Sequence, residues 1–205
     1  MNKLFSCLVA TMLIGCGGSV MHSSGTYERS INHNGIEIVD NSVKTSTEFK
    51  KAIIDCLNNS PEAVKYVRKI SIVPVFFNKK GQEIRGDYDS HSMKIRITVY
   101  DSKYIDEIDS VVYHELGHAI WFNRLTKEQR NVWDGLYSVK LMGREFSWRR
   151  GDIVGHHGMP SIYSTTNVKE FFAEHYKIYK TDQNLHEIRF WQANDLMLKQ
   201  GVISK

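Results

Sequence analysis

The clearest apolar patterns in the chain lie near its middle, where an alternating segment precedes a helical one. Residues 93–101, "MKIRITVYD", place apolar and polar side chains on opposite faces, which is the period of a half-buried strand. The apolar face comprises Ile95, Ile97 and Val99. Residues 106–125, "DEIDSVVYHELGHAIWFNRL", repeat apolar residues at helical spacing. A helix is therefore expected there, with Asp106 as its N-cap.

Shorter patterns predict further elements on the N-terminal side. Two β-rich runs, "GIEIVD" at 35–40 and "ISIVPVFF" at 70–77, predict strands. Between them, "STEFKKAIIDCLNN" at 46–59 and "SPEAVKYVRK" at 60–69 predict helices. The N-terminal part of the domain therefore combines strands with helices.

The remaining segments differ sharply in their regularity. Residues 78–90 contain two glycines and predict a turn or loop, and residues 125–165 show a mixed, loop-rich composition. Residues 167–180 and 185–200 carry apolar residues at helical spacing and predict two closing helices. The order of elements favours an α+β fold with a small sheet and a helical C-terminal part.

The first residues predict export and a lipid anchor. Residues 1–15 have a lysine near their start and then an apolar run, which is typical of a signal peptide. The run ends in "LIGC", which resembles the lipobox of bacterial lipoproteins and implies lipidation of Cys16. An ordinary secretory signal cut nearby is the alternative. Residues 16–33 are rich in Gly and Ser and predict a flexible tether, leaving 34–205 as the folded domain.

Composition limits the remaining classes of function. The 205 residues are 41% hydrophobic and 24% charged, enough for one globular domain. The net charge of +4 is too small and too dispersed to indicate nucleic acid binding. After loss of the leader and lipidation of Cys16, Cys56 is the only thiol. It cannot form an internal disulfide, and its apolar neighbours favour a buried small residue over a nucleophile.

A metal-ligand motif lies on the central predicted helix. "YHELGHAIWF" at 113–122 contains His-Glu-x-x-His, whose histidines project from one helical face and can bind one Zn²⁺. His114 and His118 are the candidate ligands, and Glu115 is placed to accept a proton from water at the open position. A chance occurrence on an ordinary helix is the alternative.

A catalytic zinc site requires a third protein ligand. The metzincin continuation would place glycine and histidine where this chain has Trp121 and Arg124, so that class is excluded. "KEFFAEHY" at 169–176 offers Glu170 and Glu174, which share one helical face. One carboxylate could bind the metal while the other accepts a hydrogen bond from a metal-bound histidine. A solvated acidic face is the alternative.

These segments carry a family resemblance. "YHELGHAI" followed by "YSTTNVKEFFAEHY" (163–176) resembles the glutamate-zincins, or gluzincins. The closest group contains the catalytic domain of anthrax lethal factor and the bacterial Pro-Pro endopeptidases. In that pattern a tyrosine lies seven residues before the ligand glutamate and a second acid four residues after it, as do Tyr163, Glu170 and Glu174. The resemblance implies a compact zincin fold.

The resemblance also implies a role for each matching residue. It implies zinc ligation by His114, His118 and Glu170, proton transfer by Glu115, oxyanion stabilisation by Tyr163, and support of a zinc-bound histidine by Glu174. Residues 93–101 would be the edge strand, which pairs with a protein or peptide substrate in extended form.

The sequence therefore predicts a membrane-tethered, extracytoplasmic zinc endopeptidase that holds one Zn²⁺ per chain and hydrolyses peptide bonds by a zinc-activated water. In a Gram-negative bacterium its lipid anchor would lie in the outer membrane. The first alternative is a catalytically silent zincin-fold lipoprotein that serves as a binding or adhesion module; the second is a structural zinc protein.

Cleavage specificity, including any preference for proline, and oligomeric state are not specified by the sequence. Other polar residues could contact metal or substrate, although a solvated polar surface is the favoured interpretation of each. They are His156, His157, Arg144, Arg149 and Arg150.

Overall fold

The computed structural model describes most of the predicted domain. It describes residues 30–42, 45, 47–78, 80–98, 107–148 and 159–204, with backbone alone for 143–148. The leader, Cys16, His156, His157, Arg149 and Arg150 lie outside the described residues, as does the side chain of Arg144. Within the described ranges, no helix is both long and apolar enough to cross a membrane.

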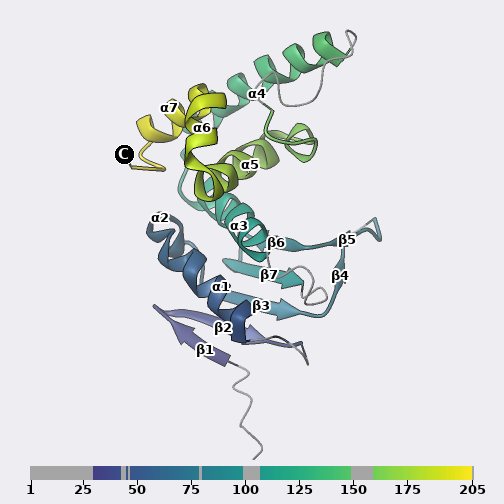
Figure 1. Ribbon diagram of the computed structural model, residues 1–205, viewed down its shortest axis with the longest axis vertical. Helices are drawn as coiled ribbons and strands as arrows, with labels where there is room; N and C mark the ends of the chain where they lie inside the picture. The colour runs from purple at the N-terminus through teal and green to yellow at the C-terminus, as the bar shows by residue number, and fades with distance from the viewer. Residues whose placement is uncertain are drawn as a thin grey trace, which may run out of the picture.

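A five-stranded mixed sheet forms the N-terminal part (Figure 1). In spatial order its strands are β1 (Ser30–His33), β2 (Ile36–Asp40), β3 (Lys69–Val73), β7 (Lys94–Thr98) and β6 (Gly86–Asp89). The three central strands run parallel, and β1 and β6 pair antiparallel at the two edges. The register places Ile38 opposite Ile70, and Ile70 opposite Ile95. These fully buried isoleucines form a continuous apolar row across the sheet.

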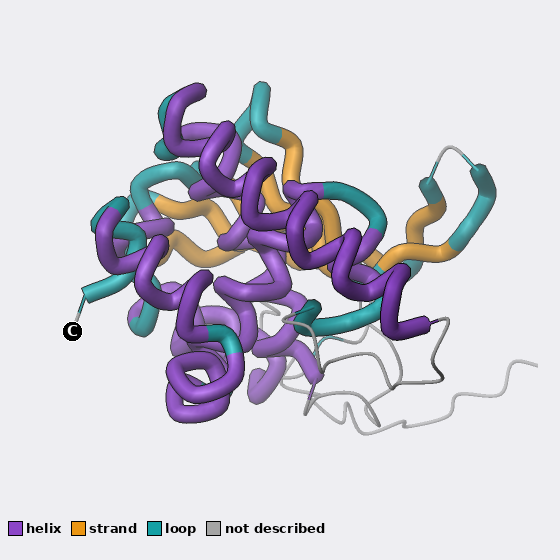
Figure 2. The backbone as a smooth tube through the Cα atoms, turned by 90° about the horizontal axis from the view of Figure 1, so that it is seen from above, coloured by secondary structure: helices purple, strands orange, loops and turns teal. Residues whose placement is uncertain are grey.

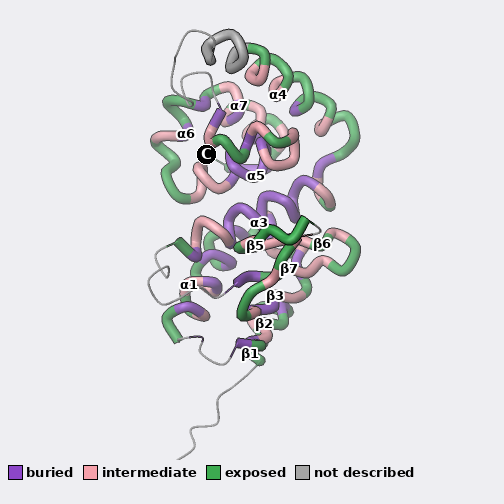
Figure 3. The backbone as a smooth tube through the Cα atoms, turned by 90° about the vertical axis from the view of Figure 1, so that its right-hand side faces the viewer, coloured by how far each residue is buried: buried purple, intermediate pink, exposed green. Residues whose placement is uncertain are grey.

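Helices pack on this sheet and continue into a C-terminal helical part. The elements are α1 (Thr47–Asn58), α2 (Pro61–Val64), α3 (Ile108–Asn123), α4 (Lys127–Trp148), the 3₁₀ turn η2 (Tyr163–Thr165), α5 (Val168–Thr181), α6 (Gln183–Arg189) and α7 (Trp191–Lys199). Helix α3 lies between the sheet and the C-terminal helices and is buried along most of its length (Figure 3). A helix with apolar residues on every side is expected in such a central position. The short hairpin of β4 (Phe76–Phe77) and β5 (Glu83–Ile84) projects to one side (Figure 2).

The structure confirms the α+β class and several predicted elements. Helix α1, strand β2, strand β7, helix α3 and helix α5 occupy the segments that the apolar patterns indicate. Cys56 is 2% exposed and a free thiol, as its neighbours predict.

Other predicted elements are wrong in extent or kind. Residues 125–165 were expected to be loop-rich, but α4 occupies 127–148 because Trp133, Leu136 and Leu141 repeat at helical spacing against the core. Strand β1 begins at Ser30, inside the expected tether, because it pairs with β2.

Three segments divide differently from the prediction. The helix expected at 60–69 spans only Pro61–Val64, because the chain from Lys69 pairs with the sheet. The strand expected at 70–77 divides at Pro74 into β3 and β4. The helix expected at 185–200 divides at Phe190, whose ring is buried in the core and whose backbone is not helical.

A buried histidine in the C-terminal part makes folding sensitive to acid. His186 is fully buried, with Nε2 3.2 Å from Nδ1 of His175 and Nδ1 3.3 Å from Oδ1 of Asn194. Burial lowers the pKa of His186 to about 4, although its hydrogen bond to Asn194 opposes this. The unfolded chain takes up this proton near pH 6.5, well above the folded chain.

The contribution of His186 to the free energy of unfolding is therefore expected to be fully present above pH 6.5 and to be lost between pH 6.5 and about 4. His186 alone accounts for about 3 kcal/mol of that loss. Urea denaturation at several pH values measures it. The His186→Gln variant should have a lower free energy of unfolding at pH 7 and should lose less of it on acidification. If its free energy of unfolding changed with pH in parallel with that of the unmodified chain, His186 would not be the source of the acid sensitivity.

Candidate metal centre

The centre lies where α3 crosses α5. A Cβ atom on Gly117 would lie 2.8 Å from Cα of Ala173, so glycine is required for the two helices to approach this closely. Asn167 caps α5 by accepting hydrogen bonds from the backbone N–H groups of Lys169 and Glu170. Because α5 begins directly after Asn167, Glu170 lies in the first turn of this helix, where it faces α3.

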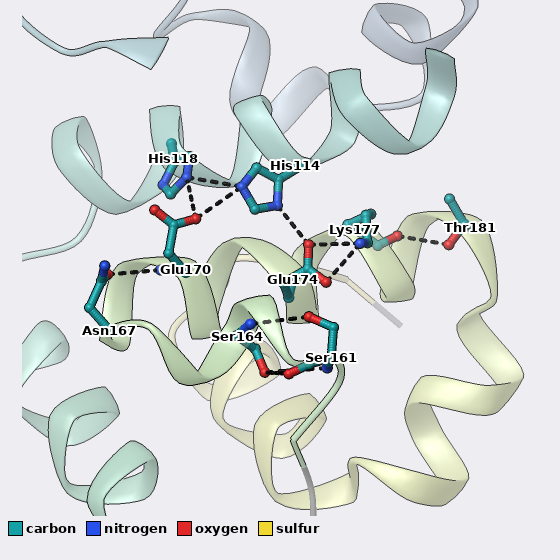
Figure 4. A network of polar contacts seen from close by, with 9 residues as sticks. All are labelled: His114, His118, Ser161, Ser164, Asn167, Glu170, Glu174, Lys177 and Thr181. Atoms are coloured by element: carbon teal, nitrogen blue, oxygen red, sulfur yellow. Dashed lines mark hydrogen bonds and ion pairs between the residues drawn. The ribbon is translucent and has the colours of Figure 1, made fainter. Parts of the chain in front are cut away.

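Three side chains converge between these helices (Figure 4). Nε2 of His114, Nε2 of His118 and Oε2 of Glu170 form a triangle with sides of 3.1 Å. Among the described residues, this is the one group of His, Cys, Asp or Glu side chains placed to hold a metal ion.

Hydrogen bonding alone does not account for the triangle. Each imidazole Nε2 carries at most one proton and a carboxylate carries none, so the three sides cannot all be hydrogen bonds. A cation between the three atoms would attract all of them. Their 3.1 Å separations are close to the roughly 3.3 Å between donors around a tetrahedral ion with bonds of about 2.0–2.1 Å. The donor set therefore fits a metal ion.

Glu174 supports His114 from the opposite side of the ring. Its Oε1 is 2.8 Å from Nδ1 of His114, and both of its oxygens are 2.7 Å from Nζ of Lys177. Burial raises the pKa of Glu174, but the hydrogen bond from His114 and the charge of Lys177 lower it to about 2. Glu174 is therefore ionised at neutral pH and holds the His114 ring with Nε2 facing the triangle.

The second histidine has a different environment. Nδ1 of His118 is buried and has no hydrogen-bond partner among the described residues. Metal-bound histidines usually donate from their other nitrogen, so the packing of its ring must hold its orientation. The Phe122 ring, one helical turn further along α3, lies with its centroid 6.4 Å from that of His118.

Glu115 lies beside the triangle and outside it. Its side chain is 4% exposed, and its Oε2 has no hydrogen-bond partner in the described part of the chain. Burial raises the pKa of this carboxyl, while the neighbouring His118 and His114 oppose the increase. A buried carboxyl with one unpartnered oxygen is available to exchange a proton with a bound molecule.

A cleft of about 520 Å³ adjoins His114, Glu115 and Glu174. Its walls come from the β5–β6 segment, the first turns of α3, η2 and α5; they include Ile84, Gly86, Val111, His114, Glu115, Tyr163, Glu174 and Lys177. The cleft therefore brings Glu115 and Tyr163 to the same space, although they are separated by 48 residues in the sequence.

Tyr163 also lines the cleft. Its side chain is about half exposed, and its ring centroid is 5.6 Å from that of His114. Partial burial, followed by the nearby charge of Glu170, raises the pKa of Tyr163 to about 12. The hydroxyl therefore keeps its proton and can donate a hydrogen bond throughout the physiological range.

The edge strand beside the centre is β6, and the prediction for residues 93–101 is wrong on this point. Strand β7 is interior, because β3 and β6 pair with its two sides. Arg96 on β7 pairs with Asp87, directly opposite on β6. A Cβ atom on Gly86 of β6 would lie 2.7 Å from Oε1 of Glu115. The edge strand therefore approaches Glu115 closely only because residue 86 is glycine.

Two of the site residues were not identified from the sequence. Lys177 lies seven residues after Glu170, on the same face of α5, and this helical spacing was a usable signal. Gly86 had no comparable signal, because its importance depends on a strand that the sequence pattern did not indicate.

Comparisons of the chain with protein-family models and with curated proteins find no match.

Proposed function

We propose that this chain is a zinc endopeptidase of gluzincin fold, tethered by lipidated Cys16 on the extracytoplasmic side of a bacterial membrane. The observation that carries the proposal is the convergence of His114, His118 and Glu170 beside Glu115, whose Oε2 has no hydrogen-bond partner among the described residues. Two imidazole nitrogens and one carboxylate oxygen are a donor set that zinc accepts, and three protein ligands are the number found in catalytic sites. The tether rests on the leader sequence.

The arrangement of elements supports the proposed fold. The gluzincin resemblance implies a small sheet with an edge strand, a HExxH helix, and a separate helical part that carries the third ligand. Here β6 is an edge strand, α3 carries both histidines, and α5 carries Glu170.

The proposed reaction is hydrolysis of a peptide bond. A bound Zn²⁺ would act as a Lewis acid toward the scissile carbonyl and lower the pKa of a water molecule. Glu115 would take the proton from the attacking water and deliver it to the leaving amine. Tyr163 would donate a hydrogen bond to the oxygen that gains negative charge. The backbone of β6 would pair with the substrate in extended form.

The position of Glu115 favours catalysis over a silent binding module or a structural zinc site. A structural site is closed by four protein ligands, whereas the group found among the described residues has three and adjoins a cleft. Keeping a buried, partly unpartnered carboxyl beside the centre is costly, and neither of those alternatives requires it.

A peptide library tests the proposal. The purified full-length chain, loaded with Zn²⁺, should cleave a proteome-derived library read by mass spectrometry, and a chelator should abolish cleavage. His118→Ala, which removes a ligand, should lose both metal and cleavage. A chain that binds one Zn²⁺ and cleaves nothing would support the binding-module alternative, whereas a chain that binds no Zn²⁺ would exclude the site altogether.

Gly86 gives a prediction specific to this structure. In Gly86→Ala the new methyl group would also lie 2.9 Å from Cγ1 of Val111, so Glu115 has to shift. A shift of about 1 Å at a catalytic group can cost up to about 100-fold. We therefore expect kcat/KM to fall 10- to 100-fold with zinc content unchanged. Gly135→Ala is the matched control, since a Cβ there meets no atom within 4 Å. Equal activity of the two variants would contradict the close approach.

A further inference from the structure

Lys177 extends the row of polar side chains that begins at the metal centre. It follows Glu174 by three residues on α5 and donates from Nζ to both carboxylate oxygens, each at 2.7 Å. The same Oε1 of Glu174 is 2.8 Å from Nδ1 of His114. Figure 4 shows the three side chains in a continuous row, and the Lys177 side chain, 22% exposed, also lines the cleft.

Glu174 needs a cation in this position. Its side chain is only 5% exposed, and a buried carboxylate without a compensating charge is costly. When Nε2 of His114 faces a metal ion, the ring is neutral and offers Glu174 one N–H group. Within the described part of the chain, Lys177 is then the one remaining cation within ion-pair distance of this carboxylate.

The pair also differs from an ordinary pair on a helix surface. Lys199 and Asp195 on α7 form such a pair, with side chains 71% and 51% exposed, and exposed pairs contribute little. Lys177 instead holds a buried carboxylate by both oxygens, and one of those oxygens also holds His114. Movement of Lys177 would therefore be transmitted to the His114 ring.

We propose that Lys177 is a positioning residue that acts through Glu174 to keep Nε2 of His114 directed at the metal ion. The inference rests on the proposed zinc site. Without Lys177, the buried Glu174 carboxylate would lose its neighbouring cation and would hold Nδ1 of His114 less firmly. The resulting loss of zinc affinity would resemble the loss seen when other groups that hydrogen-bond to a zinc-bound histidine are removed.

Zinc affinity measures this role without any peptide substrate. In competition with a chromophoric chelator, Lys177→Met should bind Zn²⁺ about tenfold more weakly than the unmodified chain, at the low end of the range for such outer partners. Lys177→Arg, which keeps the charge and two donors, should restore most of the affinity. Lys199→Met is the matched control and should bind as the unmodified chain does.

A double substitution separates positioning from a general effect of charge. If Lys177 acts through Glu174, Lys177→Met should cause no additional loss in a Glu174→Gln background. Unchanged affinity in Lys177→Met, or the same loss in both backgrounds, would overturn the inference and leave the proposed function intact. Failure of the unmodified chain to bind Zn²⁺ would overturn the proposed function, and the inference with it.

Discussion

Glu115→Gln is expected to keep one Zn²⁺ per chain and to lower kcat/KM for peptide hydrolysis by about 100- to 10,000-fold, the range for a general acid–base group. Glutamine has nearly the same shape and can fill the same buried space, so folding should survive. Its amide cannot accept the proton that Glu115 would take from the attacking water. Zinc content by elemental analysis and steady-state kinetics on a cleaved library peptide provide the two measurements.

The contrast with a ligand variant makes this test specific. His118→Ala removes one corner of the triangle and should lose metal together with activity. Glu115 lies outside the triangle, so its replacement should separate the two properties. Loss of metal in Glu115→Gln would make Glu115 a ligand, and full activity would remove it from the proposed mechanism.

The sequence predicted those parts of the fold whose patterns are local. Helix α3 and strand β7 carry regular apolar repeats, and these repeats are what packing requires. Strand β6 was not predicted, because Gly86–Asp89 contains one glycine and two aspartates and is held mainly by pairing with β7. Helix α4 was missed because many of its residues face solvent, and its apolar repeat is spread over several turns.

The candidate site was predictable to a similar degree. The spacing of His114 and His118 places them on one face of any helix, so their proximity follows from the sequence. The position of Glu170 depends on the crossing of α3 and α5, which Gly117 and Ala173 set by their small size. That crossing is a tertiary property. Residue spacing alone left Glu170 and Glu174 interchangeable, whereas the structure places Glu170 at the triangle and Glu174 behind His114.

Tyr163 is the residue whose role the sequence assigned by resemblance alone. In the structure it belongs to η2, directly before α5, and its ring lies next to that of His114. Burial, followed by the nearby charge of Glu170, raises the pKa of its hydroxyl to about 12.

Tyr163→Phe should therefore lower kcat by about 100- to 1000-fold, as removal of one oxyanion donor does. KM should change little, because the hydroxyl would act on charge that develops only in the transition state. Phenylalanine keeps the ring, so zinc content should also be unchanged. Tyr179→Phe is the matched control, since its hydroxyl bonds the backbone oxygen of Ser204 away from the cleft. If Tyr163→Phe raised KM and left kcat unchanged, Tyr163 would be a substrate-binding residue; if neither constant changed, the metal ion alone would stabilise the oxyanion.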